Sequence, residues 1–145
     1  MAAMSNYMEN HFWDWLLRAQ TFTPPATVYI GLFTATPTAS GGGTEVSGGS
    51  YARIGVTSAL ANWAGTQGAG TTTASTGTSG TTSNNGSITF AAPTANWGVI
   101  TGIGIYDALT SGNLLFYGNL TTSKTVNNGD AAPSFAAAAL SLNLS

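Results

Sequence analysis

Two adjacent prolines, Pro24 and Pro25, separate a stretch with helical periodicity from a long remainder with strand periodicity. Proline lacks the amide hydrogen that a helix needs and clashes with the preceding turn, so a helix cannot continue through this pair. Before the prolines, apolar side chains recur at helical spacing. After them, short runs rich in β-branched and aromatic residues alternate with glycine-rich turns. The sequence therefore predicts one N-terminal α-helix followed by a mainly β domain.

The helix is predicted within residues 5–20. Asn6 is placed to cap its start, and Glu9 stands at the third helical position, where a carboxylate completes a capping box. Asp14 and Arg18 are four residues apart, a spacing that allows an ion pair on the polar side of the helix. The capping residues and the apolar period agree, so this helix is the best-defined element of the sequence.

The predicted helix carries two apolar strips instead of one. The main strip consists of Met8, Phe12, Trp15, Leu16 and Ala19, and the second strip consists of Trp13 and Leu17. A helix that packs on its own domain needs a single strip. The second strip therefore indicates either deeper burial than usual or a docking face for another subunit. The enrichment of tryptophan at protein interfaces favours docking.

Short strands are predicted throughout the rest of the chain. They fall in the ranges 27–34, 51–57, 87–90, 97–106, 113–119, 122–126 and 133–144. In the long run 97–106, glycines mark places where a strand bends or admits a close neighbour. Many short strands joined by glycine-rich turns favour a jelly-roll-like or β-sandwich fold, and no 20–50-residue repeat indicates a solenoid or propeller. We expect a single domain over residues 1–145.

Two glycine-rich segments, residues 39–50 and 65–86, are predicted to be loops. The second contains no charged, aromatic or large aliphatic residue. Alone it cannot bury enough apolar area to offset the entropy cost of becoming ordered. It is therefore predicted to be either an arm that neighbouring protein holds in place or the tip of a long hairpin.

Charged side chains are unusually scarce. The chain has three basic and five acidic residues, so 6% of its residues are charged against about 25% in typical domains. Three basic residues cannot form a groove that follows phosphates, which excludes nucleic-acid binding. No apolar run approaches the roughly 18 residues of a membrane helix. A surface that is polar but carries few charges is typical of a protein that lies against other protein, or of an extracellular type of β domain.

The residues that could carry chemistry form no recognisable constellation. His11 is the only histidine and is expected to be a solvated helix residue. The scattered acids suggest neither a glycosidase pair nor a calcium loop, and the absence of cysteine removes thiolate chemistry and disulfides. Asp107 and Asp130 lie at strand–turn junctions and should bond local backbone amides, a shared cation being the weaker alternative. We therefore expect no catalytic residue, no cofactor, no metal and no enzymatic activity.

Several runs of the sequence are distinctive in combination. They are TPPATVYIGLFT, GTEVSGGSYAR, and GIYDA with the following GNLLFYG. Together they resemble a family of small virion proteins of tailed bacteriophages, and the resemblance covers nearly the whole chain. Members of that family are labelled tail-fibre proteins, and similar ones act as capsid cement or decoration proteins. The resemblance implies a β-sandwich or jelly-roll subunit on the phage particle, a homotrimer, and no catalytic residues. Residues 65–86 depart from the family by being longer and richer in threonine.

From these observations we expect a non-enzymatic capsid decoration (cement) protein. It would be made in the host cytoplasm, bind the major capsid protein on the outer surface of the head, and stabilise the head. The alternative is a tail-fibre or host-adhesion module of the same fold, in which exposed Trp63, Trp97 or Tyr117 would stack on sugar rings. The candidate interface residues are Trp13, Leu17, Tyr7, Glu45, Thr72 and Thr76.

Overall fold

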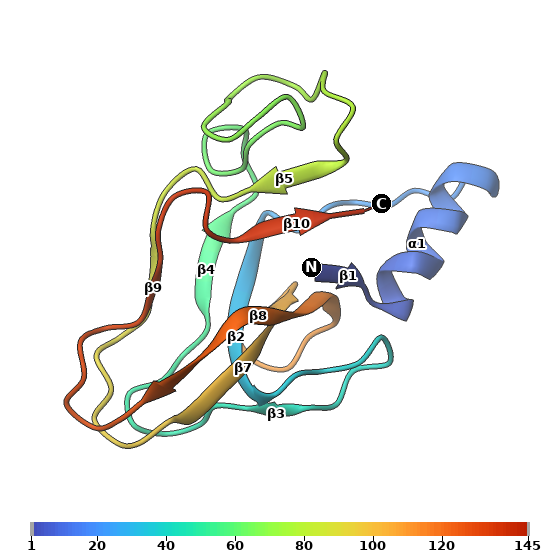
Figure 1. Ribbon diagram of the computed structural model, residues 1–145. Coiled ribbons are helices and arrows are strands. Elements are labelled where there is room, and N and C mark those ends of the chain that lie inside the picture. Colours follow the sequence, from blue (N-terminus) through green and yellow to red (C-terminus); the bar gives the residue numbers. More distant parts are fainter. Residues whose placement is uncertain (1, 145) are drawn as a thin grey trace.

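A six-stranded antiparallel sheet forms the centre of the molecule (Figure 1). The structure is a computed structural model that describes residues 2–144. The central strands follow the order β1-β8-β7-β2-β3, and β4 also pairs with β2. Their bounds are β1 (Ala2–Met4), β2 (Thr27–Ala35), β3 (Thr44–Glu45), β4 (Ile54–Thr57), β7 (Gly98–Tyr106) and β8 (Leu114–Val126). The single helix among the described residues, α1, spans Asn6–Leu17.

Two small antiparallel sheets complete the domain. One pairs β10 (Ser141–Asn143) with β5 (Thr81–Ser83), and the other pairs β6 (Ile88–Thr89) with β9 (Ser134–Phe135). Their buried side chains join those of the central sheet in one core, which includes Ile30, Leu32, Ile103, Ile105, Ile88, Phe90, Leu140 and Leu142. The expected mainly β, single-domain fold with one N-terminal helix is therefore confirmed.

Alternation along the central strands builds a second, smaller cluster on the opposite face. Phe33, Tyr106 and Leu114 are buried there. The rings of Phe33 and Tyr106 stack with centroids 6.3 Å apart. They lie beside Gly104, where an added Cβ would come 2.8 Å from Tyr106 and 3.0 Å from Phe33. The glycine-rich strand thus admits a close neighbour, as its sequence predicted.

Several strand boundaries differ from the prediction. The ranges 113–119 and 122–126 are one continuous strand, β8, and the range 133–144 is divided into β9 and β10. A register shift against β7 lets β8 continue where a break was expected. The short strands β1, β3 and β5 were not predicted, since the last two lie in segments rich in small polar residues. Their strand conformation comes from pairing and not from local preference: β1 pairs with β8, β3 with β2, and β5 with the equally short β10.

An ion pair joins β3 to the chain that leads into β4. Arg53 is buried and forms a bidentate contact with Glu45, with both N–H···O distances 2.8 Å. Its remaining Nη1 donates to the carbonyls of Ala108 (3.0 Å) and Ser111 (2.7 Å) in the turn between β7 and β8. The guanidinium also lies 3.5 Å from the centre of the Tyr106 ring. One side chain therefore connects three separate parts of the chain.

The surroundings of this pair raise the pKa values of Arg53 and of the neighbouring Tyr51. Burial alone lowers the pKa of Arg53, but the hydrogen bond and the charge of Glu45 raise it overall. Burial raises the pKa of Tyr51, and its hydroxyl donates to Glu45 Oε1 at 2.9 Å while accepting from the Leu32 amide at 2.8 Å. Gly31 leaves room for this carboxylate, since an added Cβ would lie 2.8 Å from Glu45 Oε1. The contacts of Arg53, Glu45 and Tyr51 therefore hold neighbouring strands and turns together.

Replacing Arg53 by methionine should lower the free energy of unfolding by about 3 kcal/mol, because it leaves the Glu45 carboxylate partly buried without its partner. The double variant Arg53→Met, Glu45→Leu removes both charges together and should recover part of that loss. Urea unfolding of both single variants and the double variant measures the coupling. A double variant whose loss equals the sum of the two single losses would contradict this account.

Candidate assembly surface

Helix α1 is attached to the domain at its first turn. Ser5 precedes it and is buried; its amide donates to the Leu115 carbonyl (2.9 Å) and its hydroxyl to the Leu114 carbonyl. The Asn6 amide donates to Ala39 (2.9 Å), which fixes the helix start from a second direction. The Ser5 hydroxyl also accepts from the Met8 amide (3.2 Å), so Ser5 is the N-cap. The predicted cap, Asn6, is instead the first helical residue.

Beyond this turn the helix is almost unpartnered. None of its residues is buried, and it projects beyond the β1 edge of the central sheet (Figure 1). Five large apolar side chains are exposed: Phe12 (38%), Trp13 (54%), Trp15 (56%), Leu16 (51%) and Leu17 (71%). We call these five residues the α1 apolar face. The expectation that the main strip packs on the domain is therefore wrong for Phe12, Trp15 and Leu16, which stay exposed.

The helix also ends earlier than predicted, at Leu17. Arg18 is the C-cap, and Ala19 adopts a left-handed φ of 54° where glycine is usual. The expected pair between Arg18 and Asp14 is present at 2.8 Å on the surface. His11 is half-buried between the rings of Tyr7 (4.4 Å) and Phe22 (5.2 Å), so it does not stand free in solvent as expected.

The structure does not bring the predicted interface residues together. Trp13, Leu17 and Tyr7 lie on α1, whereas Glu45 lies on β3 and is engaged by Arg53. Thr72 and Thr76 are exposed in the loop before β5, at the opposite side of the domain from β3 (Figure 1). Only the α1 group forms a continuous surface, and it is larger than predicted because Trp15, Leu16 and Phe12 belong to it.

The glycine- and threonine-rich segment 65–86 is held by its own side chains. Gln67 donates to Thr73 Oγ1 (3.0 Å) and the Ala74 carbonyl (3.2 Å), and accepts from the Thr76 amide (3.0 Å). Its last part forms β5 and pairs with β10. Hydrogen bonds within the chain therefore contribute to the shape of this loop, and whether it also contacts a neighbouring protein stays a prediction. Gln67 is the one long polar side chain in the segment. Its ability to bond several backbone and side-chain groups was missed because the prediction rested only on the overall composition of the segment.

Asn84 fastens this loop to the end of the chain. It is 1% exposed, and its Nδ2 donates to the carbonyls of Gly86 (2.7 Å) and Ala136 (2.8 Å). Its Oδ1 accepts from the Leu140 amide at 2.9 Å. An amide is the one common side chain that offers both donor and acceptor in this geometry. The side chain thus joins the approach to β6 with the approach to β10.

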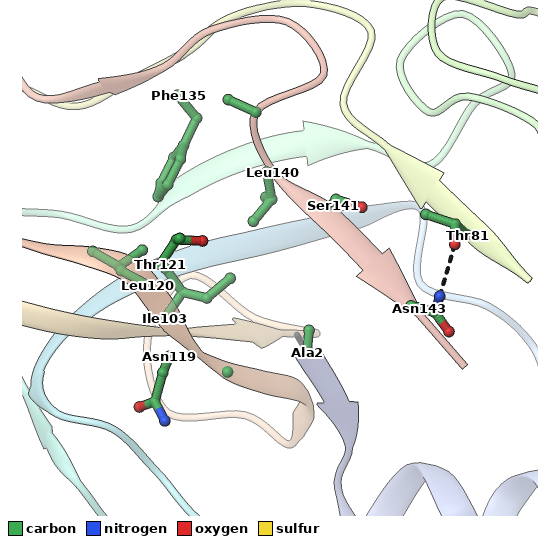
Figure 2. Close-up of a pocket in the computed structure, with 12 residues that line it drawn as sticks. Ala2, Thr81, Ile103, Asn119, Leu120, Thr121, Phe135, Leu140, Ser141 and Asn143 are labelled. Carbon is green, nitrogen blue, oxygen red and sulfur yellow. Dashed lines mark hydrogen bonds between the residues drawn. The ribbon is translucent and has the colours of Figure 1, made fainter. Parts of the chain in front are cut away.

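Two hollows lie beside the loop and the terminal strands. Figure 2 shows the first, of about 340 Å³, between β8 and β10, with Ala2, Leu120 and Phe135 on its walls. The second has a volume of about 390 Å³, and we call it the Trp63 groove. Its apolar wall consists of Val28, Trp63, Ala64, Ile105, Phe116, Leu142 and Leu144, and its polar rim of Ser58, Thr66, Ser75, Gly80 and Thr82. Neither hollow has a charged side chain in its lining.

The charged and aromatic residues singled out in the sequence can be located within residues 2–144. This part of the chain contains no group of three His, Asp or Glu residues placed to hold a metal ion. It also contains no helix long and apolar enough to cross a membrane. Asp107 accepts from the Asn113 amide and Asp130 from the Asn127 amide, both at 2.7 Å, which confirms their predicted role in turns. Trp97 is 5% exposed, so it cannot stack on a sugar as the adhesion alternative proposed.

Asn84→Asp should lower the free energy of unfolding at pH 7 by about 2–3 kcal/mol, because a carboxylate oxygen would face the two carbonyls that the amide now bonds. Facing those carbonyls raises the carboxyl pKa in the folded state, so the stability penalty should shrink as pH falls towards 4. Asn96→Asp is the matched control, since its exposed oxygen accepts from the Asn128 amide (2.8 Å) in either form. Equal losses in both variants would contradict the role of Asn84.

A comparison with protein families identifies a match over nearly the whole chain. The model of a protein family described as podophage GP4 fiber I protein gp80 matches residues 3–143, which is nearly the whole chain. No curated protein sequence matches the chain.

Proposed function

The chain belongs to the podophage GP4 fiber I protein family of phage virion structural proteins, and from this premise we propose that it is a non-enzymatic fibre subunit that assembles through α1. The observation that supports the proposal is the α1 apolar face. Its five side chains are 38–71% exposed on a helix whose start is fixed by backbone hydrogen bonds. An apolar surface of this kind is stabilised when another protein removes it from water.

The energetics favour association through this face. Burial of apolar surface contributes about 25 cal/mol per Å². Tryptophan residues, of which α1 exposes two, are the side chains most enriched among residues that dominate binding energy. Two of the charged residues of this segment, Asp14 and Arg18, already neutralise each other at 2.8 Å, and the third, Glu9, lies in the first turn of the helix. Docking on the apolar face therefore leaves this pair on the polar side of the helix.

Three of the other four acidic residues support a structural role, and the fourth, Glu9, lies in the first turn of α1. Glu45 is paired with Arg53, and Asp107 and Asp130 each hold a turn amide. General acid–base catalysis needs a carboxyl or imidazole group within reach of a substrate and free to exchange a proton. These three carboxylates are committed to the fold, which supports a protein without enzymatic activity.

Capsid decoration, with the major capsid protein as partner, is the second candidate. It is favoured by the absence of any repeat in the 145 residues that would build a long shaft. The two candidates differ in copy number and position. Electron microscopy of particles from phage with and without the gene separates them, because a fibre subunit is confined to the fibres whereas a decoration protein covers the head.

Trp13→Ala should lower incorporation into particles by at least about tenfold, because a truncated interface tryptophan typically costs 2 kcal/mol or more. Stability of the isolated protein should change by less than about 0.5 kcal/mol, since Trp13 packs on little of its own domain. Quantitative immunoblotting of purified particles and thermal unfolding provide the two measurements.

The control for this variant is Leu109→Ala. Leu109 is 50% exposed, like Trp13, but it lies in the turn between β7 and β8. It should incorporate as well as the unmodified protein. Equal losses of incorporation for both variants, or a Trp13 variant that simply unfolds, would argue against α1 as the assembly element.

A further inference from the structure

We propose that the α1 apolar face docks into the Trp63 groove of a second copy of this chain, in a head-to-tail contact. The inference rests on the proposed function, in which α1 is the assembly element, and adds the identity of its partner. One chain exposes both an apolar helix face without a covering surface and an apolar groove without an occupant.

The groove is built to receive apolar side chains. Its floor comes from core-facing positions of three central strands, Val28 on β2, Ile105 on β7 and Phe116 on β8. Trp63 and Leu142 form its sides, and the self-bonded loop 65–80 supplies part of the rim. A hollow of about 390 Å³ with such walls falls in the size range of pre-formed binding pockets.

The helix of the same chain cannot occupy this groove. The hydrogen bonds of Ser5 and Asn6 to Leu115 and Ala39 fix the direction in which α1 leaves the sheet. A helix of 12 residues is about 18 Å long and rigid. It extends beyond the β1 edge, away from β4 and from the loop before β5 (Figure 1). Reaching its own groove would require breaking the hydrogen bonds of Ser5 and Asn6 that set this direction.

The two surfaces are both mainly apolar, and the helix face is the more extensive of the two. The groove lining has no charged residue, and none of the five residues of the α1 apolar face is charged. Glu9 is the charged residue on the same side of α1, one turn before Phe12 and Trp13, so docking through Trp13, Leu16 and Leu17 leaves its carboxylate at the N-terminal end of the contact. The five side chains together expose on the order of 500 Å². A stable interface buries about 800 Å² on each partner, so the helix face supplies the larger part.

A contact between two different surfaces has consequences for assembly. Each copy then has one helix to donate and one groove to fill. Such heterologous contacts generate closed rings or open chains, whereas a contact between two α1 helices would be isologous and stop at a dimer. This difference allows the partner surface to be identified in solution without the particle.

The test uses three full-length variants that each add one arginine. Leu17→Arg places a charge on the helix face, and Ser58→Arg places one on the rim of the groove. Ser47→Arg is the control, because Ser47 is exposed in the loop after β3 and belongs to neither surface. Sedimentation equilibrium measures self-association of each, and thermal unfolding confirms that each is folded.

The unmodified protein and the Ser47 variant should self-associate equally. The Leu17 and Ser58 variants should each associate at least about tenfold more weakly. A mixture of these two variants should form a one-to-one heterodimer and nothing larger, because one intact helix then meets one intact groove. If Ser58→Arg impairs folding, Leu144→Arg takes its place, since Leu144 is 60% exposed on the groove wall.

Three results would overturn the proposal. One is a monomeric unmodified protein, another is a loss of association in the helix variant alone, and the third is a mixture that stays monomeric. The function proposed above is judged separately, by incorporation of Trp13→Ala into particles. A monomer in solution whose incorporation depends on Trp13 would keep α1 as the assembly element and assign it to a different partner.

Discussion

The pairing of Gly31 on β2 with Gly104 on β7 is the constraint on which the rest of the fold depends. With no side chain at either position, the opposite face of the sheet admits the Glu45 carboxylate at one glycine and the Phe33 and Tyr106 rings at the other. Arg53 then bridges Glu45 to the turn between β7 and β8. That turn leads into the start of β8, whose carbonyls hold Ser5 and therefore the helix. The direction of α1 is thus set from the centre of the sheet.

Scarcity of charge determines how the remaining polar groups are satisfied. Among the described residues no buried side-chain nitrogen or oxygen lacks a hydrogen-bond partner, although the chain has so few ions. Neutral side chains such as Gln67 and Asn84 bond backbone groups across loops instead. The same composition leaves a surface with little net repulsion between copies, which permits close approach of subunits. The low content of charged residues therefore affects both the hydrogen bonding of the interior and the character of the assembly surface.

The sequence predicted elements wherever a local pattern decides the structure. The helix, the long strands and the turn roles of Asp107 and Asp130 follow from period, proline and short-range hydrogen bonding. It did not predict which side of the helix would be covered, because periodicity shows that a strip is apolar but not what lies against it. The cap was placed at Asn6 instead of Ser5 because serine and asparagine are both favoured caps and the local pattern does not separate two adjacent ones. The hydrogen bonds of Ser5 to Leu114 and Leu115, more than 100 residues away in the chain, fix Ser5 as the residue that precedes the helix. Loop 65–86 required a network around Gln67 that no composition rule describes.

The projecting helix also explains how assembly can be efficient. An isolated helix of 12 residues is only marginally stable in water, so α1 depends on the anchor and cap that Ser5 provides. That anchor fixes the helix before any partner arrives, which removes much of the ordering cost that a flexible segment pays on binding. Ring contacts of Phe12 with Trp13 (5.5 Å) and with Trp15 (6.2 Å) further restrict the exposed side chains. A pre-ordered apolar helix held at a fixed angle to a rigid sheet is therefore suited to joining identical subunits in a defined geometry, because the angle is set within each subunit and not by the contact.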